Sequence, residues 1–330
     1  MHAPCHDTIS PYPLKIFSGS SHPALAKSIA QYLDVPIDLN RSTRLPDGEI
    51  HVIIEEVVRG HDIFFVQTGF DPVNRHLMET FLYLDAFHRA SAHSVTVILP
   101  YYPYARQERM SKGREAISAK VVAHLLESMH MDRLICVDIH TRAIQGFFNV
   151  PVDLLSAIPL MAQYFMRPEF DNCAIVAPDL GIAKLAGKFA KMVGKPLVII
   201  EKNRLNFEET EVVNIIGDIK GHQPILIDDV IAGGSILKQI DALYDKGAVG
   251  KTYFAITHPV LLPRAVSILD ADDRIEKLIT TDSIPLTGER MSPKIEVLSI
   301  APLLGDVIQD IYMGRSEEHT SELQSHSFIS

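Results

Sequence analysis

Two adjacent aspartates followed by a glycine pair stand in the stretch "ILIDDVIAGGSI", after an apolar run. Asp228 and Asp229 at a strand end could accept hydrogen bonds from a sugar diol or hold a metal ion. Gly233 and Gly234 would let the backbone turn its amides toward one point, and Ser235 could open a helix whose N-terminus favours an anion. The pattern predicts carboxylates for a sugar and a backbone cradle for its phosphate. A plain strand–turn–helix connection would have the same pattern.

A basic segment, "YYPYARQERMSKGREAISAK", lies in a chain that is acidic overall. The segment contains two glutamates and five basic residues, which are Arg106, Arg109, Lys112, Arg114 and Lys120. Arginine forks and lysine charges stabilise developing negative charge, so the segment could be a mobile lid that closes on a polyphosphate. A solvated surface loop is the alternative.

Further polar residues follow other apolar runs. His140 lies two residues after Asp138, where it could be a metal ligand, a nucleotide contact or a structural histidine. Asp179 precedes a helical segment, where aspartate also serves well as an N-terminal cap. Lys202 and Arg204 follow another apolar run and are either site cations or ordinary surface residues.

The segment "RLPDGE" combines a strong turn signal with two carboxylates, Asp47 and Glu49. Proline restricts φ and Gly48 accepts a positive φ, so a simple hairpin turn explains the pattern. The functional alternative is that both carboxylates accept hydrogen bonds from a ligand.

The elements that must position these residues alternate along the chain. Short Val/Ile-rich runs predict strands, namely "LKIF", "DIFFVQ", "SVTVILP", "RLICVDI", "CAIVAP", "PLVIIE", "PILIDD" and "TYFAIT". Helical spacing separates them at residues 23–33, 73–90, 116–129, 182–192, 235–246 and 300–312. Continuous apolar strands alternating with helices predict an α/β fold with parallel sheets covered on both faces, whose ligands bind at the carboxyl ends of the strands.

Composition limits the class of protein. The chain has 330 residues, 47% of them hydrophobic, and a net charge of −10, which argues against generic binding of nucleic acid or anionic membrane. No run is long and apolar enough for a membrane helix, and no signal peptide is recognisable. The three widely spaced cysteines fit a reducing cytoplasm. We therefore expect a soluble cytoplasmic protein of about two domains.

The last residues, "RSEEHTSELQSHSFIS", lack apolar periodicity and look like the translation of a sequencing adapter. We expect residues 315–330 to be an artefactual, disordered tail and exclude them from reasoning about the fold. A natural disordered tail is the alternative.

The ordered segments "PDGEI", "PVNRHLME", "YARQER", "ISAK", "DIHTRAIQGFF", "APDLG", "NIIGD" and "ILIDDV" together resemble the ribose-phosphate diphosphokinase family over residues 14–314. The resemblance implies two tandem phosphoribosyltransferase-like domains, 14–155 and 156–299, with a C-terminal helix at 300–314 packing on the first and an extension at 1–13. It implies Mg²⁺-dependent transfer of the ATP diphosphoryl group to the anomeric hydroxyl of ribose 5-phosphate, with AMP as the second product. It also implies a homo-oligomer, usually a hexamer.

The same resemblance assigns roles to residues. It carries ATP binding to Asp47, Gly48, Glu49, Arg106, Gln107 and His140. It carries metal binding to His140 and Asp179. The catalytic cations would be Lys202 and Arg204, with Arg109 and Lys112 in the closing loop. The ribose-phosphate cradle would comprise Asp228, Asp229, Ala232, Gly233, Gly234 and Ser235.

Two departures from the family pattern bear on activity. Leu45 stands where the family usually has a phenylalanine that stacks on adenine, a loss of about 0.5–1.5 kcal/mol. The cradle has three residues between its aspartates and Gly-Gly-Ser, where the family commonly has four. Losing two hydrogen bonds to a phosphate would cost roughly 3–6 kcal/mol, unless the glycines re-register the loop.

Three activities are compatible with this sequence. The ordered motifs favour an active diphosphokinase. The shortened cradle is the reason to consider a catalytically weakened paralogue that assembles with active subunits. A phosphoribosyltransferase is the third, although "PDGE" and "YARQ" have no purpose in a single-domain transferase.

Overall fold

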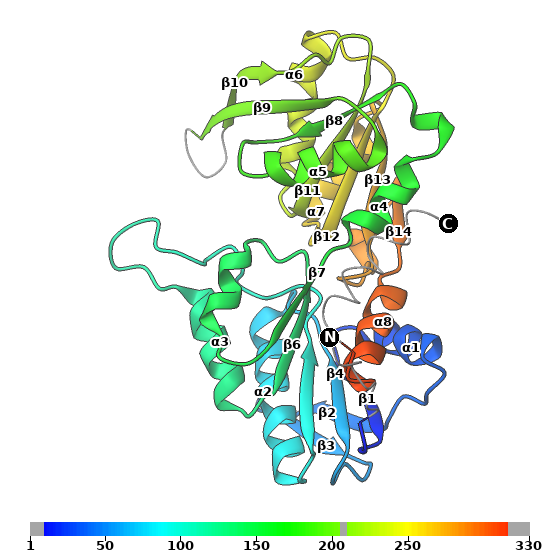
Figure 1. Ribbon diagram of the computed structural model, residues 1–330. Helices are drawn as coiled ribbons and strands as arrows, with labels where there is room; N and C mark the ends of the chain where they lie inside the picture. The colour runs from blue at the N-terminus through cyan, green and yellow to red at the C-terminus, as the bar shows by residue number, and fades with distance from the viewer. Residues whose placement is uncertain (1–9, 205–209, 316–330) are drawn as a thin grey trace, which may run out of the picture. The chain divides into compact units, whose positions relative to one another are not determined.

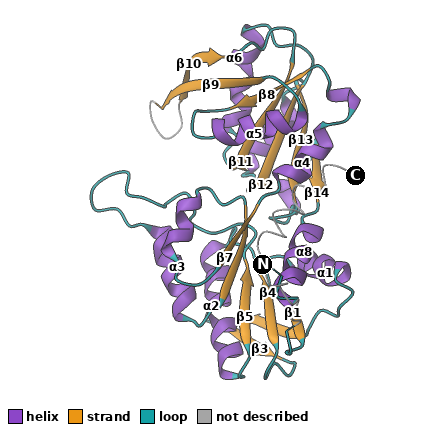
Figure 2. Cartoon of the chain, viewed as in Figure 1, coloured by secondary structure: helices purple, strands orange, loops and turns teal. Residues whose placement is uncertain are grey.

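The computed structural model describes residues 10–204 and 210–315, and strands alternate with helices along nearly all of this length (Figure 2). Contacts divide the chain into two compact units. The first contains the described residues up to Ser156, the short segment Ser283–Pro285 and the described residues from Ile300 onward. The second contains Ala157–Asp282 and Leu286–Ser299. The return of Ser283–Pro285 to the first unit was not expected from the sequence.

The first unit is built on a parallel five-stranded sheet of order β1-β4-β5-β6-β7. Its strands are β1 (Leu14–Ser18), β4 (Asp62–Val66), β5 (Ser94–Ile98), β6 (Arg133–Val137) and β7 (Val152–Leu155). A separate antiparallel hairpin consists of β2 (Asn40–Arg44) and β3 (Ile50–Ile54). The helices are α1 (Pro23–Tyr32), α2 (Val73–Arg89), α3 (Ser118–Ser128) and α8 (Ala301–Tyr312), with a 3-10 helix η1 (Arg142–Phe147).

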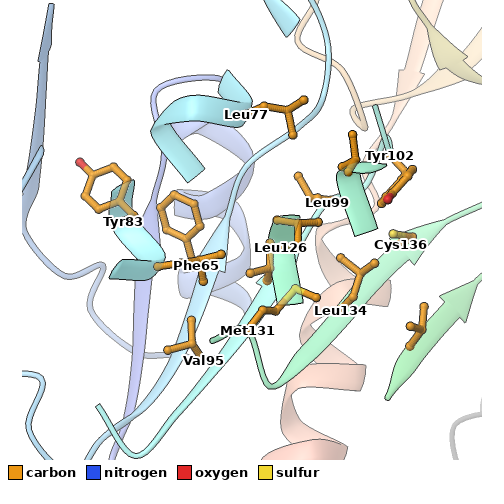
Figure 3. Close-up of a cluster of buried hydrophobic side chains, with 14 of the residues drawn as sticks. Phe65, Leu77, Tyr83, Val95, Leu99, Tyr102, Leu126, Met131, Leu134 and Cys136 are labelled. Atoms are coloured by element: carbon orange, nitrogen blue, oxygen red, sulfur yellow. The ribbon is translucent and has the colours of Figure 1, made fainter. Parts of the chain in front are cut away.

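Both faces of this sheet are covered, which is why its strands are apolar without alternation. Successive side chains of a strand point to opposite faces. Phe65 and Leu134 pack with side chains of α2 and α3 in one core cluster (Figure 3), which also contains Val97. Helices α2 and α3 lie on one side of the sheet, and α1 and α8 on the other (Figure 1). The sheet is therefore buried on both faces, and polar loops follow the carboxyl ends of its strands.

The second unit has a seven-stranded sheet of order β10-β9-β8-β11-β12-β13-β14, parallel except for the edge pair β9–β10. Its strands are β8 (Cys173–Ala177), β9 (Leu197–Arg204), β10 (Thr210–Ile216), β11 (Gln223–Ile231), β12 (Thr252–Pro259), β13 (Ile275–Thr281) and β14 (Ile295–Leu298). Its helices are α4 (Ile158–Phe165), α5 (Ala183–Val193), α6 (Ile240–Asp245) and α7 (Pro263–Ala271), with 3-10 helices η2 (Pro168–Phe170), η3 (Ser235–Gln239) and η4 (Gly288–Arg290). One core cluster joins this sheet to η3, α6 and α7.

The predicted α/β class with mainly parallel sheets is confirmed. Each apolar run that we expected to form a strand does so. The helix expected at 235–246 is different, because it begins as the 3-10 helix η3 and becomes α-helical only at Ile240. None of the described helices is both long enough and apolar enough to cross a membrane. Cys136 and Cys173 are buried free thiols, and Cys5 lies outside the described residues.

Candidate functional site

The tip of the β2–β3 hairpin carries Asp47 and Glu49 on an exposed turn. Gly48 has a φ of 98°, which glycine adopts without strain, and its N–H donates to the carbonyl of Leu45 at 2.9 Å. Oδ1 of Asp47 accepts a hydrogen bond from the N–H of Glu49 at 3.1 Å. The hairpin turn that "PDGE" predicts is present, and Asp47 helps to shape it. Ligand contacts by Asp47, Gly48 and Glu49 stay predictions.

The base of the basic loop after β5 is held on the start of α3. The side-chain oxygen of Gln107 accepts from Oγ of Ser118 at 2.8 Å, and its backbone carbonyl accepts from the N–H of Ala119 at 3.2 Å. Arg106, immediately before it, is exposed. Gln107 is therefore held at the start of α3, and Arg106 beside it is presented to solvent.

The tip of this loop is exposed, and its two glutamates interact with neighbouring residues of the same loop. Oε2 of Glu115 accepts from the backbone N–H groups of Ser111 and Lys112, which lowers the pKa of its carboxyl below the ordinary value. Nε of Arg109, whose side chain is 82% exposed, lies 3.4 Å from Oε1 of Glu108. The loop thus has internal order at Glu115 while its cations face solvent, which suits either a lid or a solvated loop.

A tight turn follows β6 and leads to His140. Asp138 has a φ of 36°, its N–H donates to the carbonyl of Leu155 at 2.9 Å, and its Oδ1 accepts from Oγ of Ser156 at 2.7 Å. His140, two residues later, is exposed. Sequence reasoning did not single out Ser156. The sequence feature that could have revealed it is its position as a hydroxyl residue directly after β7, the strand that pairs with β6.

Asp179 lies just beyond the carboxyl end of β8 and before α5. Its Oδ1 accepts from the N–H of Ile182 at 3.2 Å. Asp179 is not the N-cap of α5, which is Ile182; its carboxylate instead closes the turn that leads into the helix. A carboxylate has further lone pairs for a cation, so metal binding by Asp179 stays a prediction.

We expected Lys202 and Arg204 to follow a strand. Both instead lie within β9. The antiparallel ladder sets Lys202 opposite Val212 and Arg204 opposite Thr210 in β10. The reason is that the chain doubles back as β10, so the backbone of residues 202–204 finds hydrogen-bonding partners and the strand continues. The side chains of both residues lie outside what the structure describes.

The aspartate pair and the shortened cradle also differ from expectation. Asp228 and Asp229 lie within β11, which continues to Ile231 because β12 pairs with it as far as Pro259. After β12 the N–H of Leu262 still donates to the carbonyl of Ala232 at 3.0 Å. The backbone is therefore paired up to Ala232, and the loop before η3 is short.

Only the glycine pair then separates the paired backbone from η3. Gly234 has a φ of 81°, and a Cβ built there would lie 3.0 Å from Cα of Ala265 in α7. The carbonyl of Gly234 accepts from the N–H of Leu237 at 3.1 Å, which closes a 3-10 turn. Ser235 does open a helix, but it is the 3-10 helix η3, and the α-helix α6 begins only at Ile240. Ser235 and Gly233 are exposed, so phosphate could still reach their amides.

Carboxylates converge on this strand end. Burial raises the pKa of Asp228 well above its ordinary value, and the charges of Asp229 and then Asp179 raise it further. The neighbouring parallel strands β8 and β11 bring Asp179 close. Carboxylate oxygens are the ligands that Mg²⁺ prefers, and a cation bound near Asp228 would relieve this repulsion.

The described residues contain no group of three or more His, Cys, Asp or Glu side chains arranged to hold a metal ion. His140 belongs to the first unit and Asp179 to the second. Each unit by itself therefore supplies one of the two expected ligands, and magnesium binding by this pair stays a prediction.

Family models match both parts of the chain. Residues 14–129 match the N-terminal domain of ribose phosphate pyrophosphokinase. Residues 202–320 match the phosphoribosyl synthetase-associated domain, and this match extends beyond the boundary at 315 that we expected from the sequence.

Relatives that match over most of the chain have the same family name. A protein named ribose-phosphate pyrophosphokinase 1 from Streptococcus agalactiae is 45% identical over 307 residues, which covers 92% of this chain and 95% of the relative. One from Oceanobacillus iheyensis is 42% identical over 296 residues, covering 89% and 93%. The crystal structure of phosphoribosylpyrophosphate synthetase from Mycobacterium smegmatis superposes with a TM-score of 0.86 at 38% identity, over 92% of this chain and 99% of that one. The chain therefore belongs to the ribose-phosphate pyrophosphokinase family.

Proposed function

We propose that this protein is a ribose-phosphate diphosphokinase, which transfers the diphosphoryl group of ATP to the anomeric hydroxyl of ribose 5-phosphate and releases AMP. The observation that carries this proposal is identity of 45% over nearly the whole length of a relative with that name. A match to one unit alone would have left a phosphoribosyltransferase open. Here the match spans both units, including the hairpin and the basic loop.

In the proposed reaction, the anomeric oxygen of ribose 5-phosphate attacks the β-phosphorus of ATP. A new O–P bond forms, the bond between the β-phosphorus and the oxygen that bridges to the α-phosphorus breaks, and AMP leaves with that oxygen. The anomeric hydroxyl loses its proton. Negative charge concentrates on the transferring group, so the chain must supply cations there.

The cations proposed for this step are Lys202 and Arg204 in β9. Support comes from the resemblance of "EKNR" to the family and from the position of both residues on one strand of the second sheet. The proposal needs both cations close together, and the backbone of β9 places them two residues apart on one strand. We propose that Arg109 and Lys112 of the basic loop help to exclude water from the reacting groups.

We propose that the nucleotide is held by Asp47, Gly48 and Glu49 on the hairpin, by Arg106 and Gln107 in the loop after β5, and by His140 in the turn after β6. The hairpin tip and Arg106 are exposed, as a binding surface requires. Mg²⁺, held by His140 and Asp179, would neutralise phosphate charge when bound.

We propose that ribose 5-phosphate is held through Asp228 and Asp229 on its hydroxyls and through the segment from Ala232 to Ser235 on its phosphate. The raised pKa of Asp228 supports this proposal, because hydroxyl donors or a nearby cation would stabilise the ionised form. The open space around the Cα of Gly233 supports close approach of a phosphate to the backbone.

A second candidate, a catalytically weakened paralogue that assembles with active subunits, rests on one observation. The strand β11 continues through Ile231, so less backbone is left to wrap a phosphate than a longer loop would offer. Under either candidate we propose a homo-oligomer, a hexamer by family resemblance, that acts in the cytoplasm.

The test combines ATP, Mg²⁺ and ribose 5-phosphate with the purified full-length protein and follows AMP. We expect AMP formation that depends on the sugar phosphate. Absence of AMP, with activity restored or altered on adding an active relative, would support the weakened paralogue. Diphosphate release from phosphoribosyl pyrophosphate only in the presence of a nucleobase would indicate a phosphoribosyltransferase.

A further inference from the structure

We propose that a hydrogen bond between Tyr104 and Asn74 positions Arg106 and Gln107 for the nucleotide. Neither Tyr104 nor Asn74 is assigned to the site itself. The inference rests on the proposed function, because that function assigns ATP binding to Arg106 and Gln107. It identifies Tyr104 and Asn74 as positioning residues that act through the turn between them and the nucleotide contacts.

The bond joins two elements of the first unit. The hydroxyl of Tyr104 donates to Oδ1 of Asn74 at 2.5 Å, across 30 residues of sequence. Asn74 is the second residue of α2, and Tyr104 lies in the loop after β5. Asn74 is exposed and Tyr104 half-buried, so the bond lies at the surface. Losing it should leave the core intact.

The backbone of Tyr104 needs such support. Its φ is 57°, a left-handed conformation that is unusual for a bulky aromatic residue and that persists only when the surroundings hold it. The carbonyl of Tyr104 accepts from the N–H of Gln107 at 2.9 Å, which closes a turn of four residues. This turn places Ala105 in the interior and Arg106 in solvent.

The preceding residues are already fixed from other directions. The buried hydroxyl of Tyr102 donates to the carbonyl of Ala119 in α3 at 2.9 Å (Figure 3 shows Tyr102 in the core cluster). Pro103 packs so closely on Gly69 that a Cβ at residue 69 would lie 2.4 Å from Cδ of the proline. These contacts hold the chain up to residue 103.

What remains adjustable is the turn from 104 to 107. Ser118 and Ala119 of α3 hold it at Gln107, and Asn74 of α2 holds it at Tyr104. The hydrogen bond between Tyr104 and Asn74 is thus the contact that holds the turn to α2. Without it the strained turn can relax toward an ordinary backbone conformation. That relaxation would move Arg106 and Gln107 but not the sugar-phosphate residues of the second unit.

The experiment compares the full-length wild type with Tyr104→Phe and Asn74→Ala. At saturating ribose 5-phosphate we expect each variant to raise the KM for ATP about three- to tenfold, the range that one lost hydrogen bond corresponds to. We expect kcat to stay within about twofold and the KM for ribose 5-phosphate to stay unchanged. Calorimetric titration of MgATP into each protein should show the same weakening in Kd.

Two features separate positioning from a general structural role. The double variant should be no weaker than either single variant, because both changes remove the same bond. Asn74→Asp, which keeps an acceptor oxygen, should restore the KM for ATP. Tyr164→Phe and Asn172→Ala are matched controls, since each removes a side-chain hydrogen bond in the second unit and should leave the KM for ATP unchanged.

The inference is overturned if the KM and Kd for ATP are unchanged in Tyr104→Phe, or if the two single effects multiply in the double variant. A fall in kcat and Tm together, with the KM for ATP unchanged, would also overturn it. If the wild type forms no AMP but binds MgATP, the proposed function fails while the Kd comparison still decides the positioning role. If the wild type binds no MgATP, both fail.

Discussion

Asp228, which we propose binds the sugar, opposes the stability of the ligand-free fold. Its carboxyl is partly buried on β11 beside two other carboxylates, and its pKa is raised by burial, by Asp229 and by Asp179. The unfolded chain would ionise the same group at its ordinary pKa. Between those two values the folded state holds more protons than the unfolded state, so stability falls as pH rises through that window.

We therefore expect Asp228→Asn to raise the Tm of the ligand-free protein at neutral pH and to abolish use of ribose 5-phosphate. The gain should be absent near the ordinary pKa of aspartate and should grow as pH rises, which thermal unfolding from about pH 4 to pH 8 measures. Asp273→Asn, at an exposed carboxylate of the same unit, is the control. An unchanged Tm at pH 8 would contradict the account.

Lys202 carries the second prediction at this scale. We expect Lys202→Ala to lower kcat by about 10²–10³, the cost of removing one group that stabilises a transition state. Lys184→Ala removes an exposed lysine of α5 and should leave turnover unchanged. Turnover within about tenfold of wild type would remove Lys202 from the catalytic step.

Residue types reveal chemistry better than they reveal conformation. The acids at 228 and 229 and the cations of the basic loop could be proposed for a phosphate-binding site from their types and their place near apolar runs, and these assignments stay predictions. The left-handed backbone of Asp138 and Tyr104 could not. Neither residue is glycine, and each makes a hydrogen bond to a residue distant in sequence, Asp138 to Leu155 and Tyr104 to Asn74, which no local pattern reveals.

Among the elements, β11 departs most from expectation. A strand ends where its neighbour stops offering partners, and β12 continues to pair as far as Pro259. The sequence predicted the strand from its apolar run, but the run does not tell how far a partner strand follows. The same reason explains β9, which continues to Arg204 because β10 pairs with it. It also explains β2, whose sequence "NRSTR" is polar and forms a strand only through β3.

The short β11–η3 connection leads to a prediction about an element. Inserting a threonine after Ala232 should lengthen the loop, add a hydroxyl donor and lower the KM for ribose 5-phosphate by about tenfold or more, because hydrogen bonds to a charged phosphate contribute about 1.5–3 kcal/mol each. The same insertion after the exposed Met291 should leave that KM unchanged. Equal KM values for the wild type and the Ala232 insertion would show that the glycines already compensate.

At the scale of the whole chain, Asp62 ties the beginning and the end of the described residues to the first sheet. Its carboxylate accepts from Ser10, Ser94 and His93, and the N–H of Ser10 donates to the carbonyl of Tyr312. Burial acts to raise the pKa of Asp62, but the hydrogen bonds from Ser10, Ser94 and His93 outweigh it and lower the pKa below the ordinary value. This carboxylate therefore stabilises the fold above its unfolded pKa.

We expect Asp62→Asn to lower Tm by about 2–4 °C at pH 7, the shift that about 1 kcal/mol causes in a domain of this size. Since the folded pKa is depressed, the difference should shrink as pH falls through that pKa. Asp85→Asn, which breaks only an exposed i,i+4 pair with Arg89, should change Tm little. A difference that persists unchanged at low pH would show that charge is not the cause.

The first unit is assembled from the two extremes of the chain. Helix α8 packs on α1, where Gly305 leaves room for the ring of Tyr32 and the tyrosine hydroxyl donates to Asp306 at 2.6 Å. During synthesis the ribosome makes α1 long before α8, since residues 32 and 306 are 274 positions apart. The second unit can fold before α8 is made, while the apolar surface of the first unit that α8 covers is still exposed. A nascent chain that stalls before residue 301 would then present that face to chaperones and proteases.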